Sequence, residues 1–479
     1  MNWHSDIPLA LSYDDVMLVP RRSRISSRRD VDTSTQLTRQ LRLAVPLVSA
    51  NMDTVTESAM AIAMARVGGI GIIHRFLTVD AQAREVAKVK RAEAPVIDDP
   101  HRIADDAPIR EAHAMIRERG VSGLVVVDRR DHLVGMLTSR DLGMVPDAEF
   151  VRDAMTPRER LVVGEAGTPR DVALAMMRQA RVEKLPLVDS EGRLVGLVTM
   201  RDMVTHAQRR ETTTDARGHL AVGAAIGVRG DYLDRARALV EAGADVLVLD
   251  IAHGHAEHAV AAVSKVREGI GNDAVGIIAG NVATPDGARD LVEAGADGVK
   301  VGVGPGSVCT TRIVAGVGVP QLSAVLACAA ACADRDVPVI ADGGIRYPGD
   351  VAKAIGAGAA TVMIGGLLAG TPESPGDAVT RDGRRVKVFR GMASATAAEA
   401  RRYVDEVEDD FTPTVPEGVE TVVPLRDPAP EVVRWLVGGL RSGMSYSDAA
   451  SIAEMHRNAE FVRITPAGLN ESHPHALNG

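Results

Sequence analysis

Val246-Leu247-Val248-Leu249-Asp250 is an apolar run of strand length that ends on a carboxylate. An Ala-rich segment of helical composition separates it from Val275-Gly276-Ile277-Ile278-Ala279, and a second such segment leads to Gly298-Val299-Lys300-Val301. These runs lack the strict alternation of a half-exposed strand, which predicts strands that are buried on both faces. The region therefore predicts a repeating βα unit with a parallel sheet.

Similar runs extend outward from this region in both directions, at residues 45–49, 71–74, 222–226, 337–341 and 362–364. Eight strands that alternate with helices predict an α/β fold of the (β/α)8 TIM-barrel type. An open doubly wound sheet is the alternative. It is disfavoured because no glycine-rich phosphate turn follows the first run.

The spacing of the runs breaks once, between 71–74 and 222–226, where the gap is too long for one helix and its loops. Inside the gap, the segment that begins at Leu124 and ends at Asp141 is echoed from Leu185 to Asp202, a shift of 61 residues. A repeat of this kind predicts a paired module inserted into the barrel. We expect residues 1–92 and 206–479 to form the barrel and residues 93–205 to form the inserted pair.

The overall composition limits the classes of partner. The chain has 479 residues, of which 46% are hydrophobic and 25% charged, and its formal net charge is −9. This negative charge argues against sequence-independent binding to nucleic acid or to an anionic membrane. The sequence has no run of about 18 apolar residues, so no membrane span is predicted. The N-terminus lacks the order of a secretion signal, and three cysteines suit a reducing compartment, so we expect a cytoplasmic protein.

The most informative segment is 302–312, directly after the run at 298–301, because catalytic groups of barrels lie at the C-terminal ends of strands. Its glycines allow backbone N–H groups to approach an anion, and Ser307 could contact a phosphate. Cys309 on this loop is the candidate nucleophile. Cys328 and Cys332 are four residues apart in a helical stretch, which predicts core packing, and the sequence offers no zinc-ligand spacing.

Four motifs resemble, in order, those of the IMP dehydrogenase / GMP reductase family, and they are Tyr13 to Pro20, Asn51 to Glu57, Gly302 to Arg312 and Ala341 to Ile345. The resemblance spans nearly the whole chain. It implies that Cys309 attacks C2 of a purine nucleotide, GMP or IMP, and that Thr311 and Glu417 assist as acid–base groups. It assigns phosphate contacts to Ser307, Gly365 and Gly366, ribose-side contacts to Asp342, Gly343 and Gly344, and base contacts to Gly391, Met392, Ala393 and Gly418.

The same resemblance implies a nicotinamide cofactor beside Asp250 and Gly302. It implies a potassium ion held by the carbonyls of Gly302, Gly304 and Cys309, with Glu471, Ser472 and His473 contributed by a neighbouring subunit. A strand-end aspartate that caps a turn is the alternative for Asp250, and a solvated tail is the alternative for the last three residues. The family pattern implies a homotetramer, or an octamer formed through the inserted pair.

The inserted pair resembles two cystathionine-β-synthase-type (CBS) repeats, which family members carry after the second barrel helix. Asp141 and Asp202 match the position that holds the ribose of a nucleotide in such repeats, which implies ATP or GTP as a regulatory ligand. The alternative is local, because Thr138 and Thr199 could simply cap the helices that follow them.

The two branches of the family differ in their second half-reaction. Dehydrogenases activate water with an Arg-Tyr pair on a mobile flap, and Arg402-Tyr403 lies in that region, but residues 395–407 have a helical composition. The segments 365–370, 381–389, 391–394 and 401–403 resemble reductases, whereas 313–320, 415–418 and the inserted pair are commoner in dehydrogenases. We predict an NADPH-dependent GMP reductase, with an NAD-dependent IMP dehydrogenase as the alternative.

A non-catalytic purine-nucleotide sensor that keeps the barrel and the repeats is a further alternative. The presence of Cys309, Thr311 and Glu417 together argues against it.

Overall fold

The computed structural model describes residues 7–92, 97, 100–200, 211–271, 273, 275–402 and 415–474. The chain forms two compact units, residues 1–92 with 211–479 and residues 93–210. The predicted boundary at 205 falls in 201–210, outside the described residues. No helix among the described residues is both long enough and apolar enough to cross a membrane.

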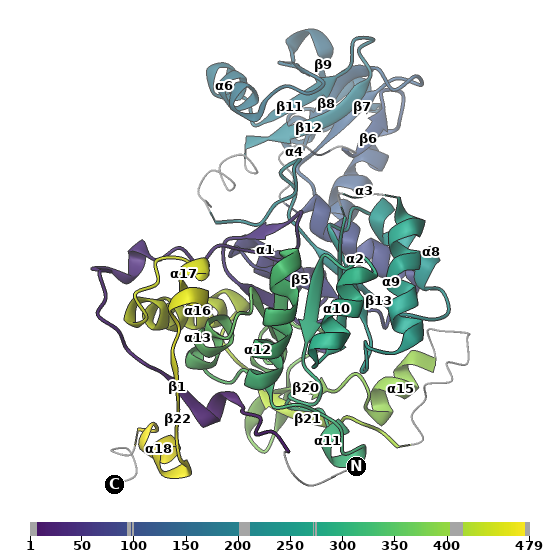
Figure 1. The fold of residues 1–479 in the computed structure, drawn as a ribbon. Helices are drawn as coiled ribbons and strands as arrows, with labels where there is room; N and C mark the ends of the chain where they lie inside the picture. Colours follow the sequence, from purple (N-terminus) through teal and green to yellow (C-terminus); the bar gives the residue numbers. More distant parts are fainter. Residues whose placement is uncertain are drawn as a thin grey trace. The chain divides into compact units, whose positions relative to one another are not determined.

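The first unit is built on a closed barrel of eight parallel strands, as predicted, with helices around it (Figure 1). Its strands, in order around the barrel, are β4 (Leu47–Ser49), β5 (Ile70–Ile73), β13 (Gly223–Ile226), β14 (Val246–Asp250), β15 (Gly276–Val282), β16 (Gly298–Val301), β17 (Val339–Asp342) and β18 (Thr361–Ile364). The barrel closes where β18 pairs with β4 through Met363 and Val48. The strands are buried on both faces, which explains why their sequences are continuous apolar runs.

The main helices of this unit follow the strands, and they are α1 (Ser58–Arg66), α2 (Val79–Arg91), α8 (Tyr232–Glu241), α9 (Glu257–Ile270), α10 (Pro285–Glu293), α12 (Gln321–Cys332), α13 (Pro348–Gly356) and α16 (Ala429–Tyr446). Local signals fix their starts. The side chain of Thr284, for example, accepts a hydrogen bond from Gly287 N at 3.3 Å, and Pro285 occupies the first helical turn of α10.

Shorter elements complete the unit, and they are η1 (Tyr13–Asp15), β1 (Val16–Leu18), η2 (Arg28–Asp30), β2 (Thr35–Gln36), β3 (Arg42–Leu43), α11 (Thr311–Val314), η4 (Ala333–Arg335), α14 (Gly366–Ala369), β19 (Val379–Arg381), β20 (Arg384–Arg390), α15 (Ala395–Arg402), β21 (Glu420–Pro424), α17 (Ile452–Asn458), β22 (Phe461–Arg463) and α18 (Pro466–Glu471). Figure 1 shows β20, β21, α11 and α15 together at one end of the barrel. The helix predicted over 395–407 is observed for Ala395–Arg402, and Tyr403 lies outside the described residues.

The second unit contains two similar halves. The first comprises β6 (Arg102–Ala104), α3 (Ile109–Arg119), β7 (Gly123–Val127), β8 (Leu133–Thr138), α4 (Ser139–Met144), α5 (Val151–Ala154), β9 (Thr156–Pro157) and η3 (Arg158–Arg160). The second comprises β10 (Gly164–Glu165), α6 (Arg170–Ala180), β11 (Lys184–Val188) and β12 (Leu194–Thr199).

Strand pairing follows the sequence repeat. Leu124 pairs with Leu137 in the first half, and Leu185 pairs with Val198 in the second, so both pairs keep the 61-residue shift. The halves also share a core cluster that includes Val125 and Val188. Because each half leaves an apolar surface that the other covers, the two halves stabilise each other.

Candidate functional site

The loop that follows β16 carries the predicted nucleophile at the C-terminal end of the barrel. Cys309 is half-buried, and its backbone N–H donates to the carbonyl of Gly306 at 3.1 Å. The loop passes close to β17, because a side chain at Gly302 would lie 2.1 Å from the carbonyl oxygen of Asp342. Gly302 also has a φ of +152°, so only glycine fits this crossing without strain.

Cys309, Thr311 and Glu417 form a continuous chain of hydrogen bonds. The Cys309 thiol donates to Thr311 Oγ1 at 3.2 Å, and Thr311 Oγ1 donates to Glu417 Oε2 at 2.8 Å. The donor order gives the thiol a path for its proton toward a carboxylate, which is what a cysteine nucleophile requires. The structure thus brings together three residues that the resemblance named separately.

The backbone around Glu417 is held between two other segments. Thr310 N donates to the carbonyl of Glu417 at 2.9 Å, and Val419 N donates to that of Val308 at 3.0 Å. On the other side, Glu417 N donates to the carbonyl of Ala393 at 3.1 Å and Gly391 N donates to that of Val419 at 3.0 Å. The residues predicted to face the base, 391–393 and 418, therefore lie beside the nucleophile loop.

The residues predicted to bind the phosphate lie on the other part of the nucleophile loop and on the loops that adjoin it. Gly366 packs against the hydroxyl of Ser307, and Gly343, which is predicted on the ribose side, packs against Pro305. Gly365 precedes the short helix α14 and lies beside Met52. The structure brings this set together as well.

Lys300 joins two predicted carboxylates and was missed by the sequence reasoning. Its ammonium lies 2.7 Å from Asp250 Oδ1 and 2.7 Å from Asp342 Oδ2, and the lysine is 2% exposed. The amide of Asn51 also donates to Asp250, at 2.7 Å, and that of Asn281 donates to Asp342, at 2.9 Å. A signal existed, since a lysine within an otherwise apolar barrel strand needs an acidic partner.

These contacts determine the charge states. Burial acts to raise the pKa of Asp250, but the attraction of Lys300 and the hydrogen bonds from Lys300 and Asn51 outweigh burial and leave that pKa below its usual value. Burial acts to lower the pKa of Lys300, but Asp250 and Asp342 outweigh it and raise that pKa. The lysine therefore stays protonated and the Asp250 carboxylate ionised at the mouth of the barrel.

The predicted cofactor and potassium ligands fit their groups in different degrees. Asp250 lies at the strand end, where it can accept from a hydroxyl, and the buried Asn281 Oδ1 has no partner among the described residues. The predicted potassium ligands, the carbonyls of Gly302, Gly304 and Cys309, are oxygen donors, the donor type that suits a hard cation, and Gly302 O already accepts from Asn281 at 2.7 Å. No cluster of three or more His, Cys, Asp or Glu side chains that could hold a metal occurs in the described part of the chain.

The tail residues predicted to contribute to the potassium site are Glu471, Ser472 and His473. Helix α18, which contains Glu471, and helix α11, which follows Cys309, lie apart in Figure 1. The ring of His473 is instead 6.4 Å from that of Tyr347. A contribution of the tail to a potassium site from a neighbouring subunit stays a prediction.

In the inserted unit, the carboxylate of Asp141 is engaged in a helix cap. Asp141 Oδ2 accepts from Thr138 N at 2.8 Å and from Thr138 Oγ1 at 2.6 Å, and Asp141 N donates back to Thr138 Oγ1 at 3.3 Å. The capping alternative thus describes this geometry, and a ribose role for Asp141 stays a prediction. Asp202 lies outside the described residues.

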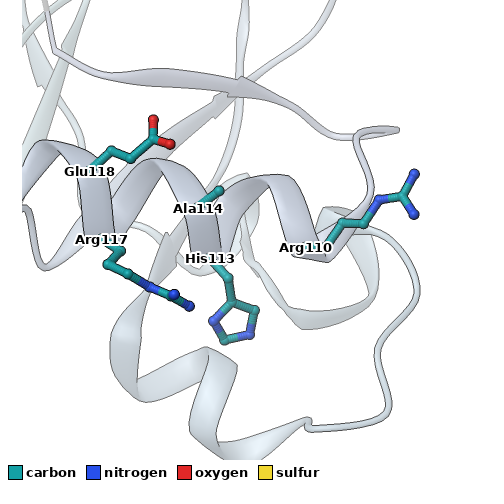
Figure 2. Close-up of a pocket in the computed structure, with 5 residues that line it drawn as sticks. All are labelled: Arg110, His113, Ala114, Arg117 and Glu118. Carbon is teal, nitrogen blue, oxygen red and sulfur yellow. The ribbon is translucent and has the colours of Figure 1, made fainter.

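A shallow pocket of this unit lies along α3 (Figure 2). Figure 2 shows the side chains of Arg110, His113, Arg117 and Glu118 projecting from this helix. Asp141, the described residue that is predicted to bind a nucleotide in this unit, is not among the residues that line the pocket.

The other two cysteines lie away from the loop, in α12, where both are buried as predicted. Burial is the main cause that raises the pKa of Cys328 to about 12 and that of Cys332 to about 11. Both thiols are therefore protonated and unreactive at neutral pH.

Comparison with known proteins gives matches over nearly the whole chain. Residues 10–475 match the model of the IMP dehydrogenase / GMP reductase domain. An inosine-5'-monophosphate dehydrogenase of Nitrosopumilus maritimus is 47% identical, over 97% of this chain and 98% of the relative. A GMP reductase of Leishmania donovani is 48% identical, over 98% of each chain.

Among solved structures, a cysteine-to-alanine variant of the GMP reductase of Trypanosoma brucei, in complex with guanosine 5'-monophosphate, superposes with a TM-score of 0.93. The two chains are 46% identical, and 99% of each is covered.

Proposed function

The chain belongs to the IMP dehydrogenase / GMP reductase family, and on that premise we propose that it is a GMP reductase, which converts GMP to IMP and ammonia with NADPH. The hydrogen-bonded chain from Cys309 through Thr311 to Glu417 carries the proposal, because it provides both a nucleophile and an acid–base group. Relatives from both branches are equally similar to this chain, so overall identity does not choose between them.

The first half-reaction follows from this chain of groups. The Cys309 thiol gives its proton through Thr311 to Glu417, and the sulfur forms a bond to C2 of the purine. The same proton is then delivered to the amino group at C2, which leaves as ammonia. A covalent Cys309–purine intermediate results, and protons balance because the substitution consumes the one that the thiol released.

NADPH would supply, when bound, the hydride that takes the place of the Cys309 sulfur at C2. Asp250 and Gly302 are the residues that we propose to hold it, beside Lys300. The C2–sulfur bond breaks in the same half-reaction, and Cys309 leaves as a thiolate that takes up a proton. No water is activated anywhere in this sequence.

We favour the reductase because its reaction requires no group that activates water. A dehydrogenase must hydrolyse the covalent intermediate, and the resemblance gives that task to an Arg-Tyr pair on a mobile flap. Here Arg402 lies in helix α15, and Tyr403 lies outside the described residues. The helix supports the reductase. The sequences of 313–320 and 415–418 are commoner in dehydrogenases, so IMP oxidation with NAD is the second candidate.

The remaining assignments belong to the same proposal. GMP or IMP would contact Ser307, the loop of Asp342 and the segments around Gly366, Gly391 and Gly418. A potassium ion would bind the backbone carbonyls of residues 302, 304 and 309 together with the tail of a neighbouring subunit. The protein would form a homotetramer, or an octamer through the CBS repeats. These repeats would bind ATP or GTP. Free thiols, one of them a nucleophile, fit the reducing cytoplasm.

One assay separates the two candidates. Purified protein is mixed with GMP and NADPH, and separately with IMP and NAD, and the nicotinamide absorbance is followed with Cys309→Ala as the blank. We expect NADPH oxidation with stoichiometric ammonia release in the first mixture. NADH formation in the second mixture alone would replace our proposal with the dehydrogenase.

A further inference from the structure

Arg390 connects four segments around the base-facing loop. It is the last residue of β20 and directly precedes Gly391. Its Nε donates to Asp53 Oδ2 at 2.9 Å, and a second guanidinium nitrogen contacts the same oxygen. A guanidinium nitrogen of Arg390 also donates to the carbonyl of Thr396 at 3.3 Å and lies 3.9 Å from the carboxylate of Glu420, and the backbone N of Arg390 donates to Thr54 Oγ1 at 3.4 Å.

The ion pair is enclosed. The side chain of Asp53 is 7% exposed and that of Arg390 is 20% exposed. A charge pair with this little solvent holds its geometry more firmly than a surface pair, and removal of one partner leaves the other charge uncompensated. The pair therefore acts as a fixed link between the barrel loop after β4 and the end of β20.

The link continues to the acid–base residue through the backbone. Residue 390 is followed by the loop 391–393, and this loop exchanges two hydrogen bonds with the segment of Glu417, from Gly391 N to Val419 O and from Glu417 N to Ala393 O. Glu420, three residues after Glu417, faces the same guanidinium. A shift of Arg390 would therefore move Glu417 relative to Thr311.

We propose that Arg390 and Asp53 are positioning residues. They fix the position of Glu417 relative to the nucleophile loop, so that its carboxylate stays within hydrogen-bond distance of Thr311. The inference deepens the proposed function and rests on it, because it concerns proton delivery in the same site. The two residues act through Glu417 rather than on the purine. A misplacement of about 1 Å in such an arrangement can cost on the order of 10²-fold in rate.

The test is a double-mutant cycle in the full-length protein. Arg390→Gln should lower kcat by on the order of 10²-fold, while KM for GMP changes only slightly, and Asp53→Asn should give the same signature. In a Glu417→Gln background, Arg390→Gln should cost almost nothing further, because the group that it positions is already absent. A residue that merely stabilised the fold would lower activity by the same factor in both backgrounds.

Two controls make the result decisive. Arg384→Gln, at an exposed position of the same strand, should leave kcat and KM unchanged. Arg390→Lys keeps the charge but loses the fork of nitrogens, so a smaller loss with the same dependence on Glu417 is expected, and this variant decides the matter if Arg390→Gln does not fold.

Additive losses in the cycle, or a raised KM with unchanged kcat, would overturn the proposal. The cycle is run in whichever direction the wild-type protein turns over. Failure of the wild-type protein to reduce GMP therefore refutes the proposed function, whereas additivity refutes the positioning role alone.

Discussion

Glu417→Gln removes the acid–base function while preserving the shape of the side chain. Glutamine can still accept the hydrogen bond that Thr311 Oγ1 donates at 2.8 Å, so the backbone contacts of this segment should persist. It cannot take up the proton that leaves Cys309 or return it to the leaving amine. The substitution therefore isolates proton transfer from binding and from folding.

The expected magnitude follows from the geometry. Both steps of the path, 3.2 Å from Cys309 to Thr311 and 2.8 Å from Thr311 to Glu417, are already within hydrogen-bond reach. The full contribution of general acid–base assistance is therefore at stake, which is typically about 10² to 10⁴ in rate. We expect kcat for GMP reduction to fall by about that factor, with GMP affinity nearly unchanged because no ground-state contact is lost.

The assay follows NADPH absorbance and ammonia release in parallel, and calorimetry measures GMP binding to the variant. Glu399→Gln, at an exposed position of α15, serves as the matched control and should retain wild-type kcat. A fall smaller than about tenfold, or a loss of GMP affinity that accounts for the whole effect, would refute the assigned role. If Arg402→Ala is instead the most damaging change and a Cys309 adduct accumulates on IMP with NAD, the protein is a dehydrogenase.

Three further outcomes are expected. Cys309→Ala should bind GMP without turnover. Iodoacetamide at neutral pH should label Cys309 before Cys328, because burial raises the pKa of Cys328 to about 12. The reverse order of labelling in mass spectrometry would contradict the assignment of Cys309 as the nucleophile. Lys300→Met leaves the carboxylates of Asp250 and Asp342, which are 20% and 23% exposed, without their cation. The free energy of unfolding measured in urea should therefore fall by about 3 kcal/mol, and a fall of less than about 1 kcal/mol would count against the network. Asp141→Asn keeps a capping acceptor but loses the carboxylate, so ATP or GTP should change kcat less in this variant than in the wild-type protein. Deletion of 93–210 should abolish the response of kcat to nucleotide and leave catalysis intact. An undiminished response in Asp141→Asn would support the capping role alone.

The barrel could be predicted from the sequence because a strand buried on both faces must be apolar throughout. Apart from Asp250 and Lys300, the runs that end at Asp250 and at Val301 have this property, and the structure places them in β14 and β16, which both pair with β15. The same logic could have found Lys300, since an ammonium in such a strand requires partners. Which carboxylates those partners are could not be read, because Asp342 lies on the neighbouring strand β17 whereas Asp250 lies two strands away on β14.

The role of Arg390 could not be predicted for a related reason. An arginine at the end of a strand is usually solvated, and nothing in the segment 384–390 separates this residue from Arg384 and Arg385. Only the fold brings Asp53, more than 300 residues earlier, to within 2.9 Å of its Nε. The enclosure that makes the pair rigid is a tertiary property.

The acid–base chain depends on a close approach that the sequence indicates only through one glycine. Thr311 and Glu417 are separated by 106 residues, and their contact requires the segment 417–419 to pass between the loops 308–310 and 391–394. Gly418 permits this passage, because a side chain there would lie 3.1 Å from Ser394 N and 3.3 Å from the carbonyl oxygen of Val308. Such contacts are tighter than most in a well-packed interior, and both involve backbone atoms, so a larger residue at 418 would press the segment away from its neighbours. Glu417 would move with it, and the path from thiol to carboxylate would break although every catalytic side chain remained present.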